Sequence, residues 1–283
     1  MQLIQDTYAA FQESLFSRPE PRMPDLQPFA DTFLRLFQEH QFSRSDNEPI
    51  SSLTLQDAYQ VQQMVIDART GGGEQVAGYK VGCTSEAIRQ QFGLSEPICG
   101  YLMTPHVIYG DAVLDHSGFF DCAVEPEFVL VIARDLVDEV GDEDNLTAAI
   151  DFVSPGIELH NYRFWFGEPT SQELIASNGI HAAMVVGDQK TSPGSFDWDA
   201  EEVGIFIGDK QAASGLGREI MGGPMNSLRW LVNHLVRRGK SLKAGQLVIP
   251  GSPTRLVPVE AGDQVSARFA NLGQVTARFS TDA

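Results

Sequence analysis

The sequence predicts an α+β fold in which helices come first and a strand-rich portion follows. Apolar side chains recur with helical spacing over residues 1–70. From residue 76 onward, short β-branched runs alternate with Gly, Pro, Asn and Asp, and one long helix interrupts them. Separate runs of helices and strands favour α+β over alternating βαβ units. We therefore expect an N-terminal helical segment at 1–75 and a strand-rich domain at 76–283.

Three helices are expected in the N-terminal segment. Their apolar residues lie at Tyr8–Leu15, Phe29–Phe37 and Tyr59–Val65. Thr54 and Asp57 resemble a capping box at the start of the third helix, and Gly71–Gly73 ends it.

The later elements are expected to be short strands around one helix. The last two strands are predicted to form a hairpin through residues 270–273, and the helix is expected to start near Pro224 and stop at Gly239. The candidate strands are Val76–Val81, Phe128–Ala133, Ala182–Val186, Val203–Ile207, Gln246–Ile249, Gln264–Phe269 and Gln274–Phe279.

Charge and composition exclude several classes of protein. The 283 residues include 20 Lys and Arg against 38 Asp and Glu, a formal net charge of −18 that repels nucleic acids and anionic membrane surfaces. Three cysteines without a CxxC motif indicate neither a disulfide framework nor a thiolate zinc site. The N-terminus lacks the pattern of a signal peptide, and the six-residue apolar run Phe128–Ala133 is too short to cross a bilayer. We expect a cytoplasmic protein.

Two glutamates interrupt the most apolar strand of the sequence. Side chains alternate along a strand, so in the segment 122–132 Glu125 and Glu127 share one face with Val129 and Val131. A strand that is apolar on both faces is normally buried. Two converging buried carboxylates repel each other and require a cation or a proton.

A third glutamate completes a candidate metal site. Glu158 lies between apolar neighbours after an expected turn at Pro155–Gly156. Three carboxylates suit a hard divalent ion such as Mg²⁺ or Mn²⁺, whereas zinc prefers His or Cys. The alternative is a solvated strand end carrying Glu125 and Glu127, with Glu158 in an ordinary turn.

Several motifs in fixed order resemble the fumarylacetoacetate hydrolase-like superfamily, in particular its branch of 2-keto-4-pentenoate hydratases and 4-oxalocrotonate decarboxylases. They span roughly residues 50 to 280. The motifs are Leu55–Gln62, Gly78–Thr84, Tyr109–Asp111, Val124–Phe128, Ile157–Glu158, Ser177–Asn178 and Leu242–Gly245.

The resemblance implies a mixed β-sandwich or roll with N-terminal helices, a bound Mg²⁺ or Mn²⁺, and a homo-oligomer. It implies that Glu125, Glu127 and Glu158 bind the metal and that Lys80 orients or acts on the substrate. Three glutamates and a divalent ion leave a charge of −1, so a 2-oxo acid anion needs the positive charge of Lys80. The alternative for Lys80 is an exposed strand lysine.

The implied activity is that of a metal-dependent lyase, hydratase-like, acting on a small 2-oxo acid through a metal-stabilised enolate, of the kind used in aromatic catabolism. Proton delivery decides between hydration, decarboxylation and hydrolysis of a carbon–carbon bond in an acylpyruvate-like compound. A non-catalytic protein that binds 2-oxo acids is the remaining alternative.

Two positions depart from the pattern of the family hydratases. Ile98 stands where they usually carry Asp, and Ile180 stands where they often carry Ser. His160 and His181 are the candidate replacements for proton transfer, since imidazole titrates near neutrality. Asn178 and Arg163 are expected to bind substrate together with Lys80, and Asn161 is a further candidate beside Arg163.

Overall fold

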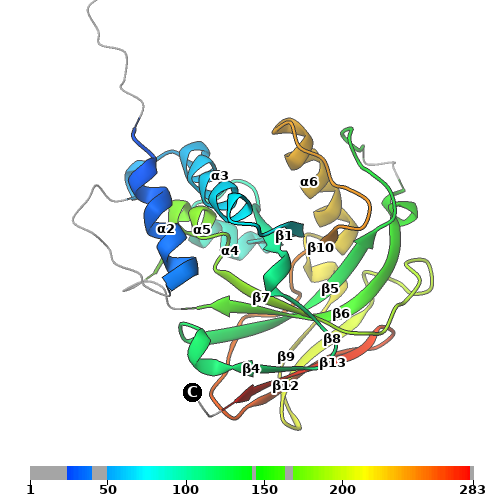
Figure 1. The fold of residues 1–283 in the computed structure, drawn as a ribbon. Coiled ribbons are helices and arrows are strands. Elements are labelled where there is room, and N and C mark those ends of the chain that lie inside the picture. Colours follow the sequence, from blue (N-terminus) through cyan, green and yellow to red (C-terminus); the bar gives the residue numbers. More distant parts are fainter. Residues whose placement is uncertain (1–23, 40–49, 142–144, 163–167, 281–283) are drawn as a thin grey trace, which may run out of the picture.

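The computed structural model describes residues 24–39, 50–141, 145–162 and 168–280 (Figure 1). It contains both helices and sheets, as the α+β prediction requires. The predicted helix at 8–15 lies outside the described residues, and so does Arg163. Within the described ranges, no helix is long and apolar enough to cross a membrane.

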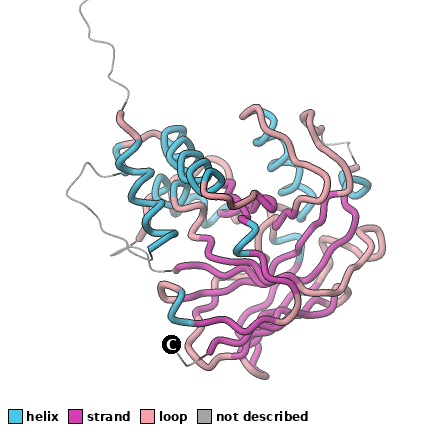
Figure 2. Tube along the Cα trace, in the orientation of Figure 1, coloured by secondary structure: helices cyan, strands magenta, loops and turns pink. Residues whose placement is uncertain are grey.

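The helices gather mainly beside the strands, where α2, α3 and α5 form one group and α6 lies apart from them (Figure 2). Thr54 and Asp57 form the predicted capping box at the start of α3, and Gly239 follows α6 with a φ of 69°. The α-helices are α2 (Gln27–Glu39), α3 (Leu55–Gly71), α4 (Glu86–Gln91), α5 (Ser171–Ala176) and α6 (Pro224–Arg237).

The strands form two sheets. The eight-stranded sheet has the order β2 (Ile98–Met103), β1 (Val76–Gly82), β10 (Leu247–Ile249), β5 (Cys122–Ile132), β6 (Ile150–Asn161), β7 (His181–Val186) and β3 (Val107–Tyr109), with β11 (Val257–Pro258) also paired to β5. The five-stranded sheet has the order β4 (Ala112–Asp115), β13 (Gly273–Ser280), β12 (Gln264–Phe269), β8 (Glu202–Ile207) and β9 (Lys210–Leu216). The predicted terminal hairpin is confirmed as β12–β13.

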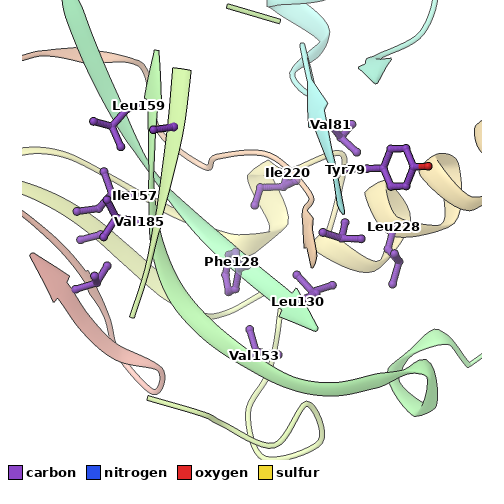
Figure 3. Packing of buried hydrophobic residues seen from close by; sticks show 14 of the residues in the cluster. Tyr79, Val81, Phe128, Leu130, Val153, Ile157, Leu159, Val185, Ile220 and Leu228 are labelled. Atoms are coloured by element: carbon purple, nitrogen blue, oxygen red, sulfur yellow. The ribbon is translucent and has the colours of Figure 1, made fainter. Parts of the chain in front are cut away.

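The main core fills the space between the sheets, where β5 and β6 contact β8, β12 and β13. Figure 3 shows Phe128 together with Ile157, Leu159 and Val185 in this core. The ring of Phe128 meets that of Phe269 edge-on, with centroids 5.2 Å apart. One face of β5 is thus committed to the core, which leaves the other face for Glu125 and Glu127.

A second cluster attaches the N-terminal helices. Val61 of α3, Phe33 of α2 and Ile175 of α5 pack together with Ile98 and Ile180. These helices share a core with residues of the strand-rich portion. The domain boundary expected between residues 75 and 76 stays a prediction.

The opposite face of the large sheet is also filled. A buried apolar cluster lies there, made of Leu102, Val129, Met184 and Leu247 among others. Strands β2 and β7, which do not pair in the sheet, contact each other. The carboxylates of β5 therefore lie beside an apolar interior.

The structure corrects one expected element. Pro155 and Gly156 form no turn but lie inside the twelve-residue strand β6, which pairs with β5 and β7. Glycine is needed here because a Cβ on Gly156 would lie 2.1 Å from Cε of Met184 and 2.5 Å from Cγ2 of Val129. Glu158 is thus a strand residue.

Candidate metal centre and active site

Strand pairing brings the three glutamates together. Glu125 of β5 stands opposite Glu158 of β6, and Glu127 stands opposite Gly156. Directly opposed residues of an antiparallel pair point to the same face with Cβ atoms about 5 Å apart. The sequence-based expectation that Glu125 and Glu127 share a face, combined with this register, puts all three carboxylates on one side of the sheet.

Burial separates the three carboxylates. Glu127 and Glu158 are buried, at 0% and 1% exposure, whereas Glu125 is partly exposed. Oε2 of Glu127 accepts a hydrogen bond from the backbone N–H of Gly251 at 3.1 Å. Oε1 of Glu127 and Oε2 of Glu158 are buried without a hydrogen-bond partner. Such orphaned acceptors are costly unless a proton or a cation reaches them.

Lys80 of β1 is a buried cation beside these carboxylates. Its Nζ lies 2.5 Å from Oε1 of Glu158 and donates to the carbonyl of Gly179 at 3.2 Å. Small residues make room for it, since a Cβ on Gly100 would lie 2.8 Å from Cγ of Lys80. The alternative of an exposed strand lysine is wrong, because Lys80 is 2% exposed.

Two histidines extend the cluster. Nε2 of His160 lies 3.0 Å from Oε1 of Glu125 and 3.5 Å from Oε2 of Glu158. Nδ1 of His181 lies 2.7 Å from Oε1 of Glu158. Both rings are buried, and the second nitrogen of each, Nδ1 of His160 and Nε2 of His181, lacks a partner. Both candidate proton-transfer residues therefore contact the carboxylate cluster.

A β-bulge places His181 in this group. The pairing of β6 with β7 runs from Leu159 opposite Ala183 to His160 opposite His181, which leaves Ala182 as an extra residue. Strict alternation would point His181 away from the face that carries Met184. The bulge reverses this alternation and brings His181 to the face of Glu158.

Electrostatics in the cluster push the carboxyl pKa values apart. Burial, together with the charges of Glu158 and Glu125, raises the pKa of Glu127 well above its ordinary value. Burial would also raise the pKa of Glu158, but His160, Lys80 and the hydrogen bond from His181 outweigh it and lower that pKa. The pKa of Lys80 is raised, because the nearby glutamates outweigh its burial. Burial lowers the pKa of His181 to about 4.

The donor set fits a divalent cation. Ligand atoms of Glu125, Glu158 and His160 all lie within 4.8 Å of one another. Glu127 adds a buried, unpartnered oxygen from the neighbouring position on the same face. With three carboxylates and Lys80, the formal charge is −3 + 1 = −2, which a divalent ion neutralises. The carboxylate oxygens of this set suit Mg²⁺ or Mn²⁺.

Asn178 and Asn161 use their side chains to hold backbone in place. Oδ1 of Asn178 accepts from the N–H of Tyr101 at 2.6 Å, and its Nδ2 donates to the carbonyl of Tyr101 at 2.8 Å. Oδ1 of Asn161 accepts from the N–H of Phe120 at 3.0 Å. Tyr101 belongs to β2, so Asn178 links this edge strand to the turn before β7.

The position of Ile98 brings an apolar side chain next to Lys80. A Cβ on Gly179 would lie 3.3 Å from Nζ of Lys80 and 3.6 Å from Cδ1 of Ile98. Ile98 and Ile180 are both buried in the cluster under the N-terminal helices. Neither side chain can exchange a proton, so the proton-transfer candidates next to Glu158 are the two histidines and Lys80.

Two backbone groups that contact the site were not predicted from the sequence. They are the N–H of Gly251, which binds Glu127, and the carbonyl of Gly179, which binds Lys80. Both glycines have positive φ values, 112° and 64°. The signal for Gly251 is its place directly after the apolar run that forms β10, where a Pro-Gly pair indicates a turn.

Comparisons with known proteins identify the family of this chain. The family described as "Fumarylacetoacetate (FAA) hydrolase C-terminal" matches residues 84–280. A 2-hydroxyhexa-2,4-dienoate hydratase from Comamonas testosteroni is 29% identical over 83% of this chain and 89% of its own length. A 2-keto-4-pentenoate hydratase from Paraburkholderia phymatum is 30% identical over 79% and 85%.

A solved structure matches almost the whole chain. The 4-oxalocrotonate decarboxylase from Pseudomonas putida G7, complexed with magnesium and adipate, has a TM-score of 0.84 and 26% identity over 92% of this chain and all of that one. The family match covers more than half of the present sequence, and the hydratase and decarboxylase relatives cover most of it. The chain belongs to the fumarylacetoacetate hydrolase family.

Proposed function

We propose that the chain is a divalent-metal-dependent lyase of the 2-keto-4-pentenoate hydratase type, which adds water to a small unsaturated 2-oxo acid. One observation supports this most: three glutamates from two paired strands lie on one face of the sheet, beside a buried lysine. The names of relatives about 30% identical to this chain favour hydration over decarboxylation or hydrolysis of a carbon–carbon bond.

Glu125, Glu127 and Glu158 would hold Mg²⁺ or Mn²⁺, with His160 as the neighbouring nitrogen donor. Support comes from the buried, unpartnered oxygens of Glu127 and Glu158 and from the uncompensated negative charge. A magnesium-bound relative of the same fold supports Mg²⁺. When bound, such an ion supplies a Lewis acid that draws negative charge from the 2-oxo group of a substrate.

Lys80 would bind the substrate anion and stabilise negative charge on it. The Nζ already has two acceptors, Glu158 and Gly179, which fix its position and leave one N–H for a ligand. A fixed, desolvated ammonium stabilises developing charge more strongly than a mobile one in water. Asn178 and Arg163 are proposed to line the substrate site, Asn178 by holding β2 beside Lys80.

His181 and His160 would transfer protons. His181 keeps one nitrogen on Glu158 and has a free Nε2, and burial keeps the ring neutral near pH 7, as a base requires. His160 likewise has a free Nδ1. The side chains of Ile98 and Ile180 cannot transfer protons, so these roles are assigned to the two histidines.

Turnover and product mass test the proposed function. Protein stripped with a chelator should not react with 2-keto-4-pentenoate, and either Mg²⁺ or Mn²⁺ should restore the reaction. Gain of one water without cleavage supports the hydratase. Loss of CO₂ or two fragments would instead identify the decarboxylase or the hydrolase, with their respective substrates as controls. Full turnover after metal removal, or binding without turnover, would overturn the proposal.

We further propose a mixed β-sandwich or roll, assembly as a homo-oligomer, and a cytoplasmic location. The two contacting sheets support the first. Tyr109 at the end of β3 and Val113 within β4, 67% and 76% exposed, support the second, because large apolar side chains so exposed often lie in subunit contacts. Light scattering measures the assembly, and a monomer at all concentrations would contradict it.

A further inference from the structure

A partly open cavity borders Ile98, the residue next to Lys80. It has a volume of about 450 Å³ and is lined by α3, the residues before β2 and the C-terminal end of α6. None of the three glutamates or the two histidines of the candidate metal centre lines it. Its walls combine apolar side chains with basic ones, namely Leu55, Leu94 and Ile175 with Arg237, Arg238 and Lys240.

The charge of this cavity opposes that of the whole chain. Three basic side chains and one carboxylate, Glu96, line it, for a formal charge of 3 − 1 = +2 in a protein of net charge −18. Arg237 pairs with Glu139 outside the cavity at 2.7 Å, and Glu96 accepts from the indole N–H of Trp230 at 3.2 Å. Within the described ranges, no carboxylate lies within 4.0 Å of the cationic groups of Arg238 or Lys240.

Neutral groups hold these two cations in place. Lys240 is partly buried, and its Nζ donates to Oε1 of Gln63 and to the hydroxyl of Tyr101. Arg238 lies over the ring of Tyr59 at 4.4 Å and donates to Nδ1 of His234 at 3.2 Å. The side chains are therefore oriented, and no carboxylate of the described residues forms a direct ion pair with either of them.

An anion would offset the cost of this arrangement. Burial lowers the pKa of Lys240, because the ammonium loses water and the attraction of Asp67 offsets this only in part. A carboxylate in the cavity would supply a direct partner through charge-assisted hydrogen bonds. The volume is in the range of small-molecule sites, and the apolar wall would accept the body of an organic ligand.

We propose that this cavity binds a small monocarboxylate with an apolar body, held by Lys240 and Arg238 and separate from the metal centre. Glu139 partly neutralises Arg237, so the net positive charge of the lining is less than +2. The single negative charge of a carboxylate matches this better than the higher charge of a phosphate. The apolar residues favour an organic carboxylate over an inorganic anion.

Titration of the Mg²⁺-loaded full-length protein with benzoate tests this site. The indole N–H of Trp230, assigned through Trp230→Phe in ¹⁵N-tryptophan-labelled protein, is the local reporter because it bonds to Glu96. Benzoate should shift this signal and release heat, and inorganic phosphate and benzyl alcohol should bind at least about tenfold more weakly, since each lacks either the apolar body or the charge.

Variants locate the binding. Lys240→Gln and Arg238→Gln should each weaken benzoate binding about tenfold. Lys210, an exposed lysine at the start of β9, does not line the cavity, so Lys210→Gln removes the same charge elsewhere and should leave the affinity unchanged. Thermal melting of each variant checks its folding, and Arg238→Gln serves if Lys240→Gln fails to fold.

Several outcomes would overturn the proposal. They are no binding of benzoate, an unmoved Trp230 signal, phosphate binding as tight as benzoate binding, and full affinity in both variants. The metal centre is tested independently, because its failure would abolish turnover and leave the Trp230 response intact.

Discussion

Glu125 and Glu158 face each other directly across the antiparallel pair of β5 and β6. Like charges in such a cross-strand position are destabilising. Lys80 and His181 contact one oxygen of Glu158, and the other accepts no hydrogen bond, with Nε2 of His160 3.5 Å away. The arrangement is therefore incomplete without a cation, and removing or adding charge at this point should have measurable effects.

Replacing Glu127 by Gln should abolish tight metal binding while the chain still folds. The amide has the same shape and removes one of three negative charges from a buried cluster, so metal-free protein should unfold at the same or a higher temperature. We expect the affinity for Mn²⁺, measured by calorimetry, to fall by at least about tenfold.

Glu139→Gln is the matched control for this experiment. Glu139 is exposed and pairs with Arg237 on the surface, so its loss should change metal affinity little. Equal Mn²⁺ affinity in Glu127→Gln and the parent would show that Glu127 is not a ligand.

Replacing Lys80 by Met should destabilise the fold and stop turnover. Removing one partner of a buried ion pair leaves the other charge uncompensated, at a cost of about 3 kcal/mol or more. Glu158 would keep only its contacts with the two histidines. Urea unfolding measures the stability and steady-state kinetics the activity.

An exposed lysine separates the general effect of losing a charge from this specific one. Lys210→Met changes the same residue type at the exposed start of β9 and should alter neither property. If Lys80→Met is as stable as the parent, the ion pair of Lys80 with Glu158 does not contribute to the free energy of unfolding.

Replacing Asn178 by Ala tests whether this residue positions β2. Tyr101 would lose partners for its N–H and its carbonyl, and buried unsatisfied groups cost about 1–3 kcal/mol each. We expect the free energy of unfolding to fall by about 3 kcal/mol. A higher KM with unchanged stability would instead identify Asn178 as a substrate ligand only.

His234 should make the stability depend on pH. Burial, and then the charge of Arg238, lower its pKa from 6.5 to about 3. Below pH 6.5 the unfolded chain takes up a proton that the folded chain does not, so the free energy of unfolding decreases as the pH falls towards 3. The slope from this residue is about 1.4 kcal/mol per pH unit.

His234→Gln should remove that slope, because glutamine can still accept from Arg238 but does not titrate. Urea unfolding of both proteins at about pH 7 and about pH 5 would measure a difference of roughly 2 kcal/mol in the pH effect. Identical pH profiles would mean that His234 is protonated equally in both states.

Much of the site was predictable because alternation fixes the faces of a strand. The segment 122–132 showed which face carries Glu125 and Glu127, and the structure confirms that the other face lies in the core. The capping box at Thr54 and the terminal hairpin were also predictable, because their signals lie within a few residues of each other.

The remaining features depend on contacts between distant parts of the chain. Pro155–Gly156 resembles a turn locally, and the reason for glycine is the side chain of Met184 from another strand. The pairing of Asn178 with Tyr101, 77 residues apart, has no local signal. Contacts between residues far apart in the chain determine the conformation at these positions, and local sequence patterns carry no information about such contacts.

The bulge at Ala182 has a consequence for engineering the enzyme. Deleting this one residue would restore regular pairing at the start of β7, in which alternation from Met184 keeps His181 on the sheet face that it shares with Glu158. The glutamates lie on β5 and β6 and would keep their mutual register. The imidazole and the carboxylates should therefore stay grouped in the shortened chain, so this strand can lose one residue without dispersing the site.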